Sequence, residues 1–125
     1  VIEAGQAQGV TIHPTGTIVV VQGPRFSTRA ESTFYGAQGW DVINMTQYPE
    51  AALARELEIC CVNISVVTDY DSALPEEQAV TVEAVVARFG EMIEQLRRLI
   101  FDVIPRIPES RSCPCGEALK DARLG

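Results

Sequence analysis

Three short segments of the sequence carry side chains that could bind or protonate a ligand. Each segment directly follows a run of apolar residues. The side chains are aromatic rings, a thioether, hydroxyls and carboxylates, on Phe26, Ser27, Met45, Thr46, Asp69, Tyr70 and Asp71. Together they suit a nucleoside: an aromatic ring packs on a flat base, and a flexible methionine lies against a sugar. A carboxylate accepts from an amino group, and a protonated carboxyl donates to a ring nitrogen.

The apolar runs before these segments predict buried strands. Thr17–Gln22 and Glu58–Val67 are rich in β-branched residues and apolar on both faces, as in a sheet covered by helices. Trp40–Ile43 predicts a shorter strand. In open α/β sheets ligands bind at the carboxyl ends of strands, so the three segments are expected to meet in one pocket.

Helices are predicted between and after these strands. Thr28–Ala37 is one, and Pro49 suits the first turn of another that extends to Leu57. Val1–Gln8 looks like the end of a helix, and Glu117–Arg123 predicts a short terminal one. Strands alternating with helices indicate an α/β domain.

The longest predicted helix follows Thr81, a suitable N-cap, and ends before Pro105. Its apolar residues recur every three or four positions and predict one stripe that packs on the sheet. The stripe consists of Val82, Val86, Phe89, Ile93, Leu96, Ile100 and Val103.

The overall composition narrows the class of protein. The chain has 125 residues and a net charge of −7, which argues against binding nucleic acid, because a phosphate backbone requires clustered lysines and arginines. No apolar run approaches the roughly 20 residues of a membrane span, and no secretory signal is evident. The expectation is therefore a cytoplasmic protein that contacts neither nucleic acid nor membrane.

The four cysteines form two tight pairs, Cys60 with Cys61 and Cys113 with Cys115. Neither pair has the Cys-x-x-Cys spacing of zinc sites, so no metal is expected. Cys60 and Cys61 fall in a predicted core strand, where cysteine usually serves as a small apolar residue. A disulfide from that strand to the tail is the alternative.

Three motifs carry a resemblance to a known family. Gly23–Ser32 (GPRFSTRAES), Asp41–Thr46 (DVINMT) and Thr68–Asp71 (TDYD) resemble the methylthioadenosine phosphorylase branch of the trimeric purine nucleoside phosphorylases. The resemblance runs in the same order from about Val1 to Ile107. It implies the C-terminal part of that fold, a mixed central β-sheet flanked by helices, over residues 1–109, with residues 110–125 as a tail.

The resemblance implies phosphorolysis of 5′-methylthioadenosine to adenine and 5-methylthioribose 1-phosphate. Phosphate is then a co-substrate, and no cofactor is expected. Asp69 matches the partner of the purine N7 and 6-amino group and is the expected catalytic acid. Its protonation or hydrogen bonding of N7 would stabilise the negative charge that accumulates on the leaving base.

Further residues match binding positions of the family. Phe26, Ser27, Tyr70 and Asp71 are expected at the purine, Met45 at the ribose and Thr46 at phosphate. Ser27 and Asp69 stand where the 6-oxopurine branch has Glu and Asn, which favours a 6-aminopurine.

The first turns of the last long helix match the lining of the 5′-substituent pocket. The residues concerned are Val82, Val85 and Val86. In the tail, Cys113-Pro114-Cys115 is similar to a Cys-x-Cys of archaeal members whose cysteines form disulfides, so the resemblance implies a Cys113–Cys115 bond.

The family's phosphate-binding N-terminal part has no counterpart in these residues. The resemblance therefore implies that catalysis needs that part, from a longer or a separate N-terminal chain, and that the enzyme assembles as a homotrimer. Two alternatives stay open: a purine nucleoside phosphorylase of broader specificity, and a non-catalytic fragment that only binds nucleoside or assembles with partners.

Overall fold

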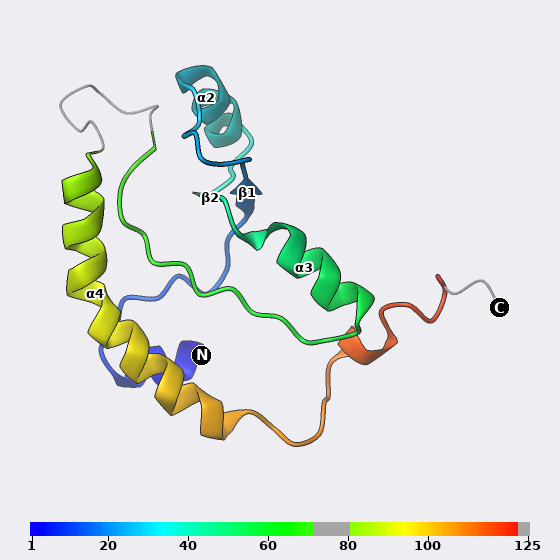
Figure 1. Ribbon diagram of the computed structural model, residues 1–125. Coiled ribbons are helices and arrows are strands. Elements are labelled where there is room, and N and C mark those ends of the chain that lie inside the picture. The colour runs from blue at the N-terminus through cyan, green and yellow to red at the C-terminus, as the bar shows by residue number, and fades with distance from the viewer. Residues whose placement is uncertain (72–80, 123–125) are drawn as a thin grey trace.

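The computed structural model describes residues 1–71 and 81–122 of the chain. These residues form helices and a small parallel sheet, an α/β arrangement (Figure 1). The elements are α1 (Ile2–Ala7), β1 (Ile18–Val20), α2 (Arg29–Ala37), β2 (Val42–Asn44), α3 (Gln47–Glu56), α4 (Val82–Val103), and the 3₁₀ helices η2 (Ile104–Arg106) and η3 (Pro114–Glu117). No helix in this part of the chain is both long and apolar enough to cross a membrane.

The sheet consists of β1 and β2, which pair in parallel and are connected in the chain by the crossover helix α2. Ile18 lies opposite Val42, and Val20 lies opposite Asn44, so both strands end at the same level. Beyond the last pair, the backbone N–H of Val21 still donates to the carbonyl of Asn44 at 3.0 Å. This register brings the segments that follow the two strands to one edge.

Two helices begin where the sequence predicts. The side chain of Thr28 accepts from the backbone N–H of Glu31, and the Glu31 carboxylate accepts from the backbone N–H of Thr28, which forms a capping box at the start of α2. Thr81 caps α4 by accepting from the backbone N–H of Ala84. Such caps satisfy donors that the first helical turn leaves unpaired.

The predicted strand Glu58–Val67 is wrong. Residues 59–71 have no regular secondary structure and run as an extended segment from α3 (Figure 1). Ile59, Val62 and Val67 are 53%, 68% and 55% exposed. A strand requires a neighbour that accepts its backbone hydrogen bonds, and within the described residues the sheet contains only β1 and β2.

The prediction that the stripe of α4 packs on the sheet is also wrong. Phe89, Ile93 and Ile100 are 45%, 38% and 40% exposed, whereas Leu99 is only 4% exposed. The helix packs on α1 instead, where Leu99 comes within van der Waals distance of Gly5 and the absence of a side chain at Gly5 leaves room for Ile12. The covered face of α4 is therefore rotated from the predicted stripe.

Smaller differences concern the ends of elements. β2 is shifted toward the carboxyl side of the predicted Trp40–Ile43, and α3 begins at Gln47, with a non-helical residue at Tyr48. The terminal helix predicted over residues 117–123 does not form in the described part, where η3 and turns extend to residue 122.

Candidate functional site

The structure brings the ends of β1 and β2 into contact. A Cβ atom built on Gly23 would lie 2.8 Å from Sδ of Met45, closer than real Cβ atoms approach another atom. A side chain at position 23 would therefore require the flexible end of Met45 to shift away from the segment after β1. The half-buried Met45, predicted at a ribose, thus lies at the edge that the two strands share.

The segment after β1 also contacts the third predicted segment. Oγ of Ser27 donates to Oδ1 of Asp71 at 2.5 Å, although 44 residues separate them in sequence. Ser27 is only 9% exposed, and Asp71 is half-buried. The predicted meeting of three segments is therefore observed, although no strand precedes Asp71.

Ser32 extends this contact into a short chain of hydroxyls. Its Oγ lies 3.1 Å from Oγ of Ser27 and 3.0 Å from the carbonyl of Thr28, so one proton is shared between two acceptors. Ser32 is 5% exposed. When Ser32 donates to Ser27, the proton of Ser27 is directed to Asp71, which keeps that carboxylate as an acceptor.

Sequence reasoning missed Ser32. The signal was its position four residues after the N-cap Thr28, where a helical serine commonly bonds back to a carbonyl in the preceding turn.

Asp69, Phe26 and Tyr70 are exposed to solvent, next in sequence to the residues of the Ser27–Asp71 pair or separated from one of them by a single residue. Oγ1 of Thr68 donates to Oδ2 of Asp69 at 2.6 Å, which orients the carboxylate that was predicted to be catalytic. Phe26 is 67% exposed beside Ser27, and Tyr70 is 69% exposed beside Asp71. The exposed rings are therefore accessible to a flat ligand, and their role in binding a purine stays a prediction.

The hydroxyl of Thr46 is not used to cap α3. Thr46 is the N-cap residue, but its side chain makes no capping hydrogen bond. The side-chain oxygen of Asn44 instead accepts from the backbone N–H groups of Thr46 and Gln47 at 3.3 and 3.2 Å. This arrangement leaves the hydroxyl, predicted at phosphate, at an exposed helix N-terminus, a favourable environment for an anion.

The predicted 5′-pocket residues lie at the start of α4. Val82 and Val86 are 70% and 64% exposed, and Val85 is half-buried. Figure 1 shows the first turn of α4 apart from β1 and β2, with the segment after α3 between them. The described residues thus present an open apolar surface there, and its role in binding stays a prediction.

Arg25 has a structural partner within the first motif. Its guanidinium forms a two-pronged ion pair with Glu31, at 2.8 and 2.7 Å. The hydrogen bonds from Arg25, followed by those from Thr28, lower the pKa of Glu31 to about 2. The pKa of Arg25 is raised, mainly by its hydrogen bond to Glu31. Both residues therefore hold the loop that carries Phe26 and Ser27.

The burial and the bonding of the cysteines both differ from what the sequence predicted. Cys60 and Cys61 are exposed rather than buried in a strand, and all four cysteines are free thiols. The Cys113–Cys115 disulfide is therefore not formed in this structure, and Sγ of Cys113 lies 3.2 Å from Sγ of Cys60 instead. Hydrogen bonds, chiefly with the Cys115 backbone, lower the pKa of Cys113 to about 7, and the contact with Cys113 raises the pKa of Cys115 to about 11.

Comparison with known proteins places the fold and these segments in a family. Residues 1–105 match the sequence model of the phosphorylase superfamily, which shows that the chain belongs to that superfamily. The match contains the three motifs identified from the sequence and both strands of the sheet.

Individual relatives give a finer comparison. The chain is 50% identical over 106 residues to a purine nucleoside phosphorylase of Streptomyces coelicolor, covering 83% of the chain and 38% of that protein. It is 46% identical over 123 residues to an S-methyl-5′-thioadenosine phosphorylase of Thermofilum pendens, covering 98% and 46%. The chain thus spans less than half the length of these relatives.

Solved structures agree with the assignment. A methylthioadenosine phosphorylase from Schistosoma mansoni in complex with adenine superposes with a TM-score of 0.81 at 32% identity. The superposition covers 96% of this chain and 48% of the other.

Proposed function

We propose that the protein containing this chain catalyses phosphorolysis of 5′-methylthioadenosine to adenine and 5-methylthioribose 1-phosphate. The observation that carries the proposal is the Ser27–Asp71 hydrogen bond, which joins two segments predicted to hold the purine. Relatives named S-methyl-5′-thioadenosine phosphorylase support the choice of substrate. Such an enzyme is a pentosyltransferase of nucleoside salvage.

The first step of the proposed mechanism is recognition of the base. Phe26 packs on the purine, with Tyr70 beside it, and Asp71 accepts a hydrogen bond from the base or its amino group. Ser27 donates to one oxygen of Asp71, which restricts the directions in which the carboxylate can accept. Pre-oriented acceptors lose less free energy to reorganisation when the substrate binds.

Asp69 acts on the leaving base. As the glycosidic bond breaks, negative charge accumulates on the purine, and a carboxyl group at N7 stabilises this charge by donating a proton or hydrogen bond. The ionised carboxylate instead accepts from a 6-amino group. The hydroxyl of Thr68 holds Asp69 in place through its 2.6 Å hydrogen bond.

Met45 lies under the ribose in this proposal, and Thr46 binds phosphate with its uncommitted hydroxyl. Val82, Val85 and Val86 line the pocket for the methylthio group. An apolar wall favours a methylthio group over a hydroxyl by a few kcal/mol at most. Phosphate is a co-substrate, and the reaction requires no cofactor.

We further infer that additional sequence completes the phosphate site, because this chain spans 46% of the Thermofilum relative. That sequence belongs either to a longer chain or to a separate N-terminal chain. The exposed stripe of α4, including Phe89 and Ile93, is the kind of surface that such sequence would cover. Assembly as a homotrimer in the cytoplasm completes the proposal.

A purine nucleoside phosphorylase of broader specificity is the second candidate. It is favoured by the 50% identity to the Streptomyces protein of that name. The two candidates differ at the 6-position of the purine. The carboxylate of Asp69 can accept a hydrogen bond from a 6-amino group. A 6-oxygen has no proton to donate, so a 6-oxopurine leaves that carboxylate without a partner.

The experiment that tests the proposal is an assay of adenine release from 5′-methylthioadenosine with and without phosphate. The proposal predicts release that requires phosphate and yields 5-methylthioribose 1-phosphate in equal amount. Release at the same rate without phosphate would indicate hydrolysis and contradict the proposal. No release from the intact protein would support the remaining alternative, a non-catalytic protein that binds nucleosides or only assembles.

A further inference from the structure

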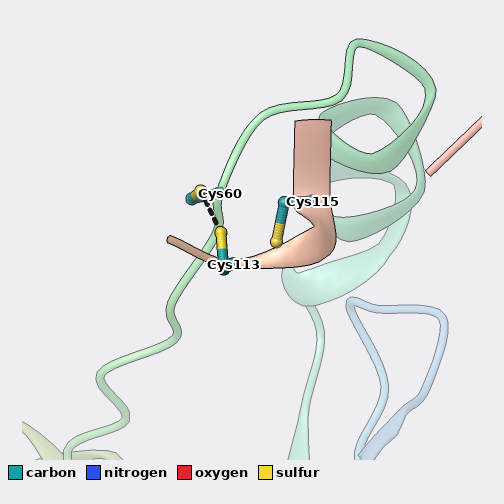
Figure 2. Close-up of side chains that lie close together, drawn as sticks. All are labelled: Cys60, Cys113 and Cys115. Carbon is teal, nitrogen blue, oxygen red and sulfur yellow. Dashed lines mark hydrogen bonds between the residues drawn. The ribbon is translucent and has the colours of Figure 1, made fainter. Parts of the chain in front are cut away.

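Three cysteine side chains from two distant segments gather at the C-terminal end of α3. Cys60 lies in the segment after α3, and Cys113 and Cys115 flank Pro114 at the start of η3. Their three sulfur atoms all lie within 4.8 Å of one another, and Sγ of Cys60 is 3.2 Å from Sγ of Cys113. Figure 2 shows the side chains of Cys60 and Cys113 approaching from the two segments, with the sulfur of Cys115 turned toward the same space.

This spacing suits a single thiolate-bound ion. With Zn–S bonds of about 2.3 Å, sulfurs in a tetrahedral site lie roughly 3.8 Å apart. The Cys60–Cys113 separation is 3.2 Å and the other two are no more than 4.8 Å, so all three lie within about 1 Å of what such a site requires or below it. Small side-chain rotations would bring the three sulfurs to equal distances, with the fourth position left to water.

Solvent access also favours an ion. Cys60 and Cys113 are exposed, and Cys115 is half-buried, so an ion can enter from solvent.

The two segments are already held together by contacts outside the sulfurs. Nη1 of Arg111 donates to the carbonyl of Glu58, and the backbone N–H of Leu119 donates to Oε1 of Glu58 at 3.2 Å. These contacts fix the tail against the end of α3 on both sides of the cysteine pair. The ligand positions are therefore partly preorganised before any ion binds.

We propose that Cys60, Cys113 and Cys115 bind one Zn²⁺ ion and that this ion fixes residues 110–122 to the end of α3. Each thiol loses its proton to solvent as its sulfur binds the ion. The expectation that no metal binds considered only spacing along the chain, and it missed a cluster whose members lie 53 residues apart. The site is independent of the proposed phosphorolysis, since α3 separates it from the strand ends (Figure 1).

The test is titration of the purified, reduced protein with Zn²⁺, and with Co²⁺ as a coloured substitute. The proposal predicts one ion per chain, sulfur-to-cobalt charge-transfer absorption, and slower hydrogen exchange in residues 110–122 after Zn²⁺ is added. Cys60→Ser, Cys113→Ser and Cys115→Ser should each weaken Zn²⁺ binding at least about tenfold, the smallest loss seen even for residues that only support a ligand.

Cys61→Ser is the matched control, because Cys61 is an exposed thiol beside Cys60 but outside the cluster. It should leave Zn²⁺ binding unchanged. Three results would overturn the proposal: no stoichiometric Zn²⁺ binding, equal effects of Cys60→Ser and Cys61→Ser, or a disulfide within the cluster in protein purified under anaerobic conditions.

Discussion

Oγ of Ser27 donates a 2.5 Å hydrogen bond to Oδ1 of Asp71, a half-buried carboxylate 44 residues further along the chain. From the sequence, each of the two residues was predicted to contact a purine on its own. In the structure one positions the other, with Ser32 behind them. The site therefore depends on a polar pair as much as on individual ligand contacts.

Ser27→Ala should lower the free energy of unfolding and weaken purine binding together. A hydrogen bond to a charged group contributes about 1.5–3 kcal/mol, and its loss leaves Asp71 with one donor fewer. Urea unfolding and the KM for 5′-methylthioadenosine measure the two effects. Ser110→Ala, at an exposed position in the tail, should change neither.

The same pair can be examined by a double-mutant cycle of Ser27→Ala with Asp71→Asn. Because the residues are in direct contact, the two effects on unfolding should not add, and a coupling of about 0.5–3 kcal/mol is expected. Strict additivity would show that the hydrogen bond contributes nothing to stability.

Thr46→Val and Asn44→Ala should separate phosphate binding from helix capping. Asn44 caps α3, so Asn44→Ala should lower the free energy of unfolding by about 1 kcal/mol. Thr46 has no capping role, so Thr46→Val should raise the KM for phosphate and leave unfolding nearly unchanged. A normal phosphate KM in Thr46→Val would remove Thr46 from the phosphate site.

Glu31 should titrate near pH 2, well below an ordinary glutamate, because Arg25 and Thr28 bond to its charged form. A group whose pKa is lowered by folding stabilises the fold above its unfolded value of 4.5. That stabilisation is lost as the pH falls from this value toward 2. Carbon NMR of the Glu31 carboxyl measures the folded pKa.

Arg25→Gln should return the pKa of Glu31 toward its ordinary value. Arg88→Gln is the matched control, since Arg88 pairs with Glu91 on α4. An unchanged Glu31 titration in Arg25→Gln would show that the ion pair does not form in solution.

Val86→Ser should reduce the preference for 5′-methylthioadenosine over adenosine by about tenfold, since one apolar contact in such a pocket is worth roughly 1–3 kcal/mol. Val86 is 64% exposed, so the variant should fold normally. The ratio of kcat/KM for the two nucleosides measures the effect. Val62→Ser, at a similarly exposed valine after α3, should leave the ratio unchanged.

Local signals in the sequence predicted much of the fold. Thr28 and Thr81 mark helix starts because capping is decided within one turn. The strand around Val19 was also predicted from a local signal, its run of β-branched residues. The Glu58–Val67 strand was wrong because a strand also needs a partner, and residue composition does not reveal one.

The site was predicted in part. The motifs identified which segments meet, but the direction of a hydroxyl such as Ser32 depends on packing that no short pattern specifies. The face of α4 that packs on α1 was misjudged because several rotations of that helix bury apolar residues, and the contact with α1 covers Leu99 rather than the predicted stripe. The cysteine cluster required the tail to fold back on α3, a contact between distant residues.

The measurement that tests the central claim most directly is kcat/KM for 5′-methylthioadenosine and for inosine, both with phosphate, in the wild-type protein and in Asp69→Asn. At least a hundredfold preference for 5′-methylthioadenosine is expected in the wild type, because a 6-oxopurine that covers Asp69 would take the carboxylate out of water without offering it a donor. Asp69→Asn should lose that preference and turn over 5′-methylthioadenosine about 10²–10⁴-fold more slowly. Comparable turnover of both nucleosides by the wild type, or unchanged turnover in Asp69→Asn, would contradict the account.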